Sequence, residues 1–130
     1  MSYIEVEFVV SSGNPLELAQ FYSFLCNGKI LKGENKSHFL VLSSSGMRIN
    51  LYRPSSRSDL INKGRGAAIC LQKKINSDCL TALREWIAEI ISKGGEVLEE
   101  RLEDFGAEAW MKDPEGNDFL IVVVPLDDDP

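Results

Sequence analysis

The same order of secondary-structure patterns occurs twice in this sequence. In the first half, an alternating apolar segment at 3–10 precedes an amphipathic helical segment at 15–26, and three short strand-like segments follow. In the second half, a strand-like segment at 67–73 precedes a helical segment at 77–93, again with three strand-like segments after it. One such half has too few strands to bury both sides of a sheet well, so the repeat predicts two paired βαβββ modules.

The later strands of each half are short and separated by turn residues. A helix between the first and second strands of a module permits a parallel pair between its first and fourth strands. We therefore predict an α+β fold with mixed sheets and with the helices on the outer face. The six later strands are expected at 29–32, 38–42, 47–52, 96–102, 107–112 and 118–124.

The second helix has the strongest amphipathic pattern in the chain. Three residues before it, Asn76, Ser77 and Asp78, are suitable N-caps, and Gly94 and Gly95 are suitable residues to end it. Its predicted buried stripe consists of Leu80, Leu83, Ile87, Ile90 and Ile91.

The chain has the size and composition of one globular domain. It has 130 residues, of which 44% are hydrophobic and 26% are charged. We expect a single domain over 1–130, with module one at about 1–53 and module two at about 66–125. A surface linker is expected at about 54–65, where no periodicity is sustained, and an acidic tail at 126–130.

Charge and hydropathy exclude several classes of partner. The formal net charge of −6 gives no general attraction to nucleic acid or to anionic membrane surfaces. The longest apolar stretch, at 119–125, is far shorter than the roughly 20 residues that cross a bilayer. Three cysteines without C-x-x-C spacing argue against a disulfide framework and a thiolate metal site. We expect a cytoplasmic protein with reduced thiols.

The face of each sheet that points away from its helix is predicted to carry both polar and apolar side chains. Such a mixture is typical of a cleft that holds a small molecule through a few hydrogen bonds, although a merely solvated sheet face is the alternative. Alternation assigns to these faces Glu5, Glu7, Val9, Arg48, Asn50, Tyr52, Ala68, Cys70, Gln72, Asp118, Leu120 and Val122.

The chain resembles the vicinal oxygen chelate superfamily, which includes glyoxalase I, extradiol dioxygenases and bleomycin-resistance proteins. The resemblance covers nearly the whole chain and rests on the repeated module order, on the helix segment 18–22 (LAQFY) with Leu25, and on the turn 113–117 (DPEGN) before the last strand. It implies a cup-shaped mixed sheet with the helices outside.

The resemblance also implies where a divalent metal would bind. Enzymes of this superfamily take one ligand from the first and last strand of each module, which correspond here to Glu7, Asn50, Ala68 and Leu120. Alanine and leucine have no lone pair to donate, so we expect no metal and no other cofactor. His38, the single histidine, is expected to lie away from these four positions, with no identified partner. Cys70 is expected to be a small packing residue, with a nucleophile as the alternative.

Glu7 and Arg48 are expected to face one another and to orient the ligand, because the first and fourth strands are neighbours in the superfamily's sheet. A surface ion pair is the alternative. Trp110 lies either in the core or beside the ligand. The full set of predicted ligand-binding residues is Glu7, Arg48, Asn50, Tyr52, Cys70, Gln72, Trp110 and Leu120.

The leading functional hypothesis is a metal-free protein of the bleomycin-resistance type that sequesters a small organic ligand. The second is a divalent-metal-dependent enzyme of the glyoxalase or dioxygenase type, and the third is a non-catalytic interaction module. The resemblance further implies a homodimer, which the apolar last strand supports only weakly.

Overall fold

The computed structural model of this chain describes residues 7–33, 36–53 and 68–126. By its internal contacts the chain divides into two compact units, Met1–Asn62 and Lys63–Pro130. The predicted linker at 54–65, the start of the first predicted strand and all of the predicted tail except Leu126 lie outside the described residues.

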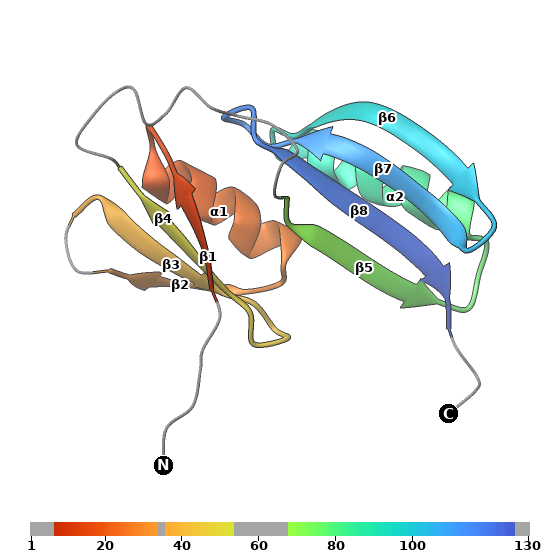
Figure 1. The fold of residues 1–130 in the computed structure, drawn as a ribbon, viewed down its shortest axis with the longest axis horizontal. Helices are drawn as coiled ribbons and strands as arrows, with labels where there is room; N and C mark the ends of the chain where they lie inside the picture. Colours follow the sequence, from red (N-terminus) through yellow and green to blue (C-terminus); the bar gives the residue numbers. More distant parts are fainter. Residues whose placement is uncertain (1–6, 34–35, 54–67, 127–130) are drawn as a thin grey trace, which may run out of the picture. The chain divides into compact units, whose positions relative to one another are not determined.

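The first unit is a four-stranded sheet covered on one face by a helix (Figure 1). Along the chain its elements are β1 (Glu7–Ser11), α1 (Pro15–Leu25), β2 (Lys29–Lys32), β3 (His38–Leu42) and β4 (Arg48–Tyr52). The strand order in the sheet is β1-β4-β3-β2. The outer strand β1 runs parallel to β4, while β2, β3 and β4 form antiparallel pairs.

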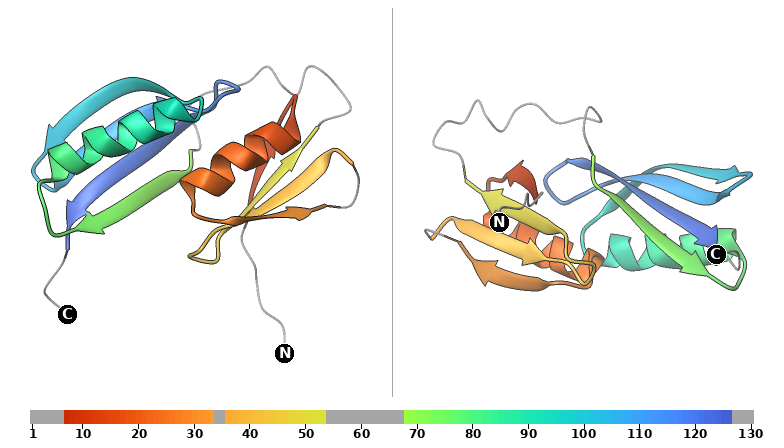
Figure 2. Two further views of the ribbon diagram at one scale, coloured as in Figure 1. Left: turned by 180° about the vertical axis from the view of Figure 1, so that it is seen from behind. Right: turned by 60° about the horizontal axis from the view of Figure 1, so that its bottom comes forward.

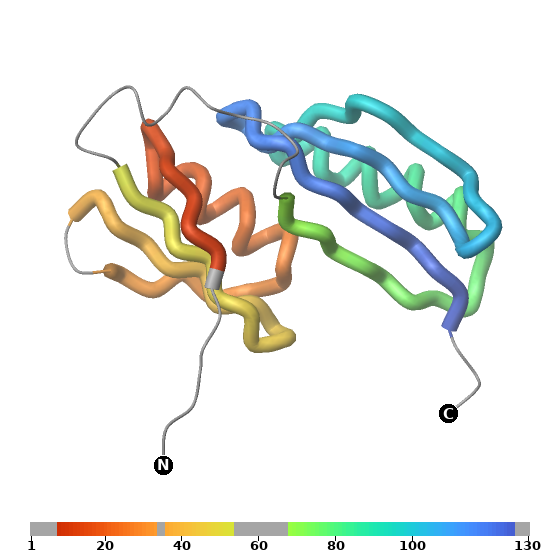
Figure 3. Tube along the Cα trace, in the orientation of Figure 1, coloured from red at the N-terminus to blue at the C-terminus, as the bar shows by residue number. Residues whose placement is uncertain are grey.

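The second unit has the same arrangement. Its elements are β5 (Cys70–Ile75), α2 (Cys79–Ser92), β6 (Glu96–Glu103), β7 (Gly106–Lys112) and β8 (Asp118–Pro125), in the sheet order β5-β8-β7-β6. The outer strand β5 pairs in parallel with β8, and the Cα trace shows the same neighbours for the first and last strands of both units (Figure 3). The predicted α+β fold of two βαβββ modules is confirmed.

Helix α1 begins and packs as its sequence predicts. The side chain of Asn14 accepts a hydrogen bond from the Glu17 N–H, and Pro15 occupies the first turn, where no N–H is needed. The helix lies over one face of the sheet (Figure 2). In this sheet Val41, Ile49 and Leu51 are fully buried. The buried residues of α1 are Pro15, Leu18, Ala19, Phe21, Tyr22 and Leu25.

Helix α2 is capped by Asp78, one of its three predicted caps. The Thr81 N–H and hydroxyl both donate to Asp78 Oδ2, at 2.9 and 2.7 Å. These bonds stabilise the carboxylate and lower the pKa of Asp78. Among the described residues, neither α1 nor α2 is long and apolar enough to cross a membrane.

The buried stripe of α2 differs from the predicted one at three residues, and of these Leu80 is half-buried. Trp86 is 5% exposed and belongs to the core, whereas Ile91 is 47% exposed. At about 100° per residue, Ile91 lies about 80° around the helix from Leu83, beyond the edge of the stripe. Lys73 of β5 extends its ammonium over the Trp86 ring, 4.3 Å from the ring centroid, which covers the indole at the margin of the core.

Candidate ligand-binding faces

Each sheet has one face beneath its helix and one face that points away from that helix, here called the open face. In the first unit, Ile49 and Leu51 are buried on the helix side, so the alternate residues Arg48, Asn50 and Tyr52 of β4 belong to the open face. The strand register extends this face across the sheet. The first open face consists of Val9, Ser11, Lys29, Leu31, His38, Leu40, Leu42, Arg48, Asn50 and Tyr52, and Glu7 occupies the register position beside Arg48.

The first open face combines exposed apolar side chains with polar ones. Val9 is 62% exposed, Leu31 42% and Tyr52 36%, although all three lie in a regular sheet. Arg48 and Asn50 are half-buried between them. Apolar surface with a few fixed polar groups is the composition of small-molecule sites.

His38 lies within this face, and the prediction that it stands apart from the four superfamily positions is wrong. It is opposite Tyr52 in the antiparallel register, and its Nε2 is hydrogen-bonded to Oδ1 of Asn50, one of those positions. Because an amide oxygen only accepts, the imidazole carries a proton on Nε2. The ring packs on Gly33, where any Cβ would overlap it. The sequence contains a signal for this position of His38. A turn at 43–47 sets Leu42 opposite Arg48, and the antiparallel register then sets His38 opposite Tyr52.

Glu7 and Arg48 are Cα partners in the parallel register of β1 and β4. The predicted contact between their side chains stays a prediction, and a double-mutant cycle with Glu7→Gln and Arg48→Met tests it. We expect a coupling in the free energy of unfolding above about 1 kcal/mol, more than exposed ion pairs give.

The control for this cycle is the pair Arg84 and Glu100, whose side chains meet at 2.8 Å on the surface of the second unit. Their coupling is expected to stay below about 1 kcal/mol, since the two side chains are 65% and 32% exposed. Independent losses of a few tenths of a kcal/mol for Glu7→Gln and Arg48→Met would show that both side chains are solvated.

The second unit places four predicted ligand-binding residues, Cys70, Gln72, Trp110 and Leu120, on its open face. Cys70 of β5 pairs with Leu120 of β8, and Gln72 pairs with Val122. Trp110 pairs with Leu120 from the other side and is half-buried, while its neighbours Ala109 and Met111 are buried on the helix side. Trp110 therefore lies on the open face. Ala68 is half-buried and precedes β5. The second open face consists of Cys70, Gln72, Lys74, Glu96, Glu99, Arg101, Glu103, Glu108, Trp110, Lys112, Asp118, Leu120, Val122 and Val124.

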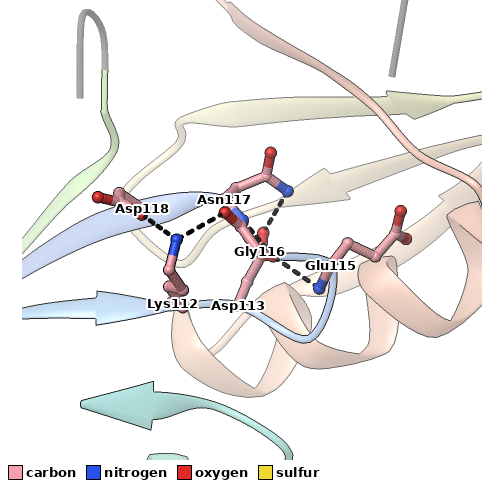
Figure 4. A network of polar contacts seen from close by, with 6 residues as sticks. All are labelled: Lys112, Asp113, Glu115, Gly116, Asn117 and Asp118. Carbon is pink, nitrogen blue, oxygen red and sulfur yellow. Dashed lines mark hydrogen bonds and ion pairs between the residues drawn. The ribbon is translucent and has the colours of Figure 1, made fainter. Parts of the chain in front are cut away.

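The 113–117 turn is held by the side chain of Asp113, which is 3% exposed (Figure 4). Its Oδ1 accepts hydrogen bonds from the N–H groups of Glu115 and Asn117, both at 2.9 Å, and its Oδ2 accepts one from Asn117 Nδ2 at 2.6 Å. Lys112 and Asp118, which flank the turn, form an ion pair at 2.9 Å. The Asp113 carboxylate therefore has a structural task, which is to close the β7–β8 hairpin.

Comparison with known proteins supports the fold. No protein-family model matches the sequence, and no curated protein matches it significantly. Among solved structures, a glyoxalase/bleomycin resistance protein/dioxygenase family enzyme from Burkholderia phytofirmans has a TM-score of 0.70 at 12% identity, covering 93% of this chain and 99% of its own. The chain has the vicinal oxygen chelate fold.

Two further structures with the vicinal oxygen chelate fold are similar to this chain. A variant of the fosfomycin resistance protein FosX from Listeria monocytogenes, in complex with Mn(II) and dihydroxypropylphosphonic acid, has a TM-score of 0.69 at 14% identity, covering 94% of this chain and 90% of its own. Lactoylglutathione lyase from Agrobacterium tumefaciens has a TM-score of 0.57 at 15% identity, covering 95% of this chain and 94% of its own.

The residues at the four positions that the resemblance assigns to metal ligands do not fit a divalent metal. Ala68 and Leu120 offer no donor atom, and Asn50 uses its amide oxygen to accept from His38. Only Glu7 is an ordinary metal ligand, whereas such sites need about four to six donors. Among the described residues, no three His, Cys, Asp or Glu side chains are grouped as a metal would require.

Cys70 is exposed, so the prediction that it is a packing residue is wrong. The pKa of its thiol is raised by desolvation and by the nearby Glu108 carboxylate, which does not favour the thiolate that a nucleophile needs. Burial raises the pKa of the Cys26 thiol to about 11.

The different exposure of Cys26 and Cys70 predicts different reactivity. In the folded protein at pH 8, we expect iodoacetamide to modify Cys70 and to leave Cys26 unmodified, as peptide mass spectrometry would show. Both should react in urea, which is the control, and equal rates in the folded protein would contradict the prediction.

Because the Cys26 pKa is raised from 9.0 to about 11, its effect on stability is absent below pH 9. Between pH 9 and about 11 the unfolded chain loses the Cys26 proton more readily than the folded protein does. The free energy of unfolding should therefore fall over this range.

Proposed function

We propose that this protein binds a small organic molecule on the open face of its sheet and does so without a metal. The observation that carries the proposal is the composition of the first open face. There, Arg48, Tyr52 and the hydrogen-bonded His38 and Asn50 stand among exposed apolar side chains. Exposed apolar groups in a regular sheet, beside polar groups held by hydrogen bonds, are suited to an organic ligand with several polar atoms.

The vicinal oxygen chelate fold supports the same proposal. A FosX variant with this fold was solved with Mn(II) and a phosphonic acid, so the fold can hold a small ligand. In this chain the donor set at the ligand positions favours binding without the metal, because two of the four positions are Ala68 and Leu120. The second open face adds Cys70, Gln72, Trp110 and Leu120 as proposed contacts.

Two alternatives remain from other functional classes. A divalent-metal-dependent glyoxalase- or dioxygenase-like enzyme would need ligands outside the four superfamily positions. A non-catalytic interaction module would need no small ligand at all. No observation on the described residues favours either of these over ligand binding.

Metal content and ligand binding together test the proposed function. Protein grown in metal-supplemented medium is expected to contain far less than one Zn, Ni, Fe or Mn per chain by elemental analysis. One metal per chain, lost in Glu7→Ala, would favour the enzyme.

In a thermal-shift screen of small metabolites, a true ligand at about 100 times its Kd should add about 2.7 kcal/mol of stability. A screen without any such ligand would favour the interaction module.

The proposal includes a cytoplasmic homodimer. Light scattering coupled to size-exclusion chromatography at micromolar concentration should give about twice the chain mass of 14.5 kDa. A monomer mass across a tenfold dilution series would contradict the dimer and would leave the ligand-binding proposal unaffected.

A further inference from the structure

We infer that the outer edge of strand β6, together with the flank of helix α2 beside it, binds a basic, extended segment of a partner protein. The segment would add a strand to the second sheet. This interaction surface uses none of the proposed ligand contacts, so the inference goes beyond the proposed function and does not rest on it.

Strand β6 is an open edge of the second sheet (Figure 1). It is eight residues long, whereas β2, which holds the corresponding place in the first sheet, has four. Within the described part of the chain, the only strand that pairs with β6 is β7. The outward N–H and C=O groups of such an edge can pair with a strand of another chain.

The edge carries exposed apolar side chains on its helix side. Val97 is opposite Met111 and Leu102 is opposite Ala107, and both partners are buried beneath α2. Val97 and Leu102 themselves are 38% and 68% exposed, and Leu98, at the register shift of β6, is 39% exposed. Helix α2 therefore covers the neighbouring strand and leaves this edge uncovered.

The flank of α2 adds Ile91 to the same surface. Arg84 Nε donates to Glu100 Oε1 at 2.8 Å, so the flank that carries Arg84 faces β6. Ala88 and Ile91 follow at four and seven residues and lie on this flank. A short turn joins α2 to β6, so the two run in opposite directions. Seven helical residues and three strand residues both span about 10 Å, which sets Ile91 level with Val97.

Charge decides which strand fits this edge. The segment 84–104 contains seven Asp and Glu against three Lys and Arg, a net charge of −4. Two of the basic residues, Arg84 and Arg101, are already paired with Glu100 and Glu99. A second copy would bring the four Glu and one Arg of its own β6 against the same charges, which is unfavourable. A basic segment of another protein meets complementary charge.

The two faces of the edge determine the pattern of the partner segment. Side chains of an added strand alternate between the faces. On the helix side they meet Val97, Leu102 and Ile91, and on the other side they meet Glu96 and Glu103. The partner is therefore a segment in which apolar and basic residues alternate. Main-chain hydrogen bonds would provide its affinity, and the alternate side chains its specificity.

Fluorescence anisotropy of the full chain with a labelled peptide tests the inference. The probe alternates lysine and valine over eight residues, the length of β6. We expect saturable binding with a Kd in the micromolar range, and binding at least about tenfold weaker for a peptide that alternates glutamate and valine.

Ile91→Ala and Leu102→Ala should each weaken binding of the lysine–valine peptide about fivefold, because each removes apolar surface that the peptide covers. Leu16→Ala is the matched control. Leu16 is also an exposed aliphatic residue, at 43%, but it lies on α1 of the first unit, so this variant should bind the peptide as the wild type does.

Two N-methylated peptides test the main-chain pairing without any variant of the protein. One is methylated at every valine nitrogen and the other at every lysine backbone nitrogen, so each keeps its charge and lacks the amide donors of one strand edge. At least one of them should bind about tenfold more weakly than the parent peptide. Unchanged affinity of both would reduce the effect to charge attraction and overturn strand addition.

Other outcomes would also overturn the inference. These are a lysine–valine peptide that does not saturate at millimolar concentration, equal binding of the glutamate–valine peptide, or an equal loss in Leu16→Ala. If Leu102→Ala instead converted a dimer to a monomer in light scattering and no peptide bound, the occupant of the edge would be a second copy. Since none of these measurements involves a small ligand, such a failure would leave the proposed function standing.

Discussion

Replacing Asp113 by alanine should lower the free energy of unfolding by about 3 kcal/mol. The substitution removes three hydrogen bonds to one carboxylate and leaves the N–H groups of Glu115 and Asn117 without this acceptor. Hydrogen bonds to charged groups contribute about 1.5–3 kcal/mol each, and buried unsatisfied donors cost a similar amount. Urea unfolding followed by circular dichroism measures the loss.

Two variants control the Asp113 prediction. Asp113→Asn keeps an amide oxygen at the turn and should lose less than Asp113→Ala. Asp104→Ala lies in the exposed turn between β6 and β7 and should change stability by no more than about 0.5 kcal/mol. Equal losses in Asp113→Ala and Asp104→Ala would mean that the 113–117 turn is held by its backbone alone.

A second large effect is expected at Gly106, the first residue of β7. Gly106 is buried and has a φ of +150°, which L side chains rarely adopt. A Cβ there would lie 3.2 Å from the Val124 Cα and closer still to the Val123 carbonyl oxygen, and these backbone atoms belong to the paired strand β8. Gly106→Ala should therefore destabilise the protein by about 3 kcal/mol or more, from steric overlap and backbone strain together.

Gly46→Ala separates these two causes. Gly46 also has a positive φ, +95°, but a Cβ there would have no atom within 4 Å. Gly46→Ala should lower the free energy of unfolding only through the unfavourable backbone conformation, by about 1–2 kcal/mol. If Gly106→Ala lowered the free energy of unfolding no more than Gly46→Ala does, steric overlap between β7 and β8 would not contribute to the loss.

The element order could be predicted from sequence because its signals are local. Strands β2 and β3 have the predicted bounds, since each is delimited by Gly, Asn or Ser residues that cannot continue a strand easily. The stripe of α2 was predicted less well, because Ile91 and Trp86 both lie near its edge and only the sheet beneath decides which is covered.

The candidate site was harder to predict than the fold. Residues on one strand were assigned to their face correctly, as for Arg48, Asn50 and Tyr52, because alternation alone decides it. The hydrogen bond between His38 and Asn50 joins two strands, so predicting it requires the register between those strands. The position of Trp110 could not be inferred from its own chemistry, since an indole suits a core and a ligand site equally well.

The parallel pairing in each unit also bears on how the chain folds during synthesis. Glu7 pairs with Arg48, forty-one residues later, and Cys70 pairs with Leu120, fifty residues later. Antiparallel neighbours such as β3 and β4 can close locally, whereas β1 and β5 acquire their partners only when their own unit has been fully made. On the ribosome, we expect β1 to remain an unpaired edge until β4 emerges, so the residues of β1 on the first open face are the last of their unit to be ordered.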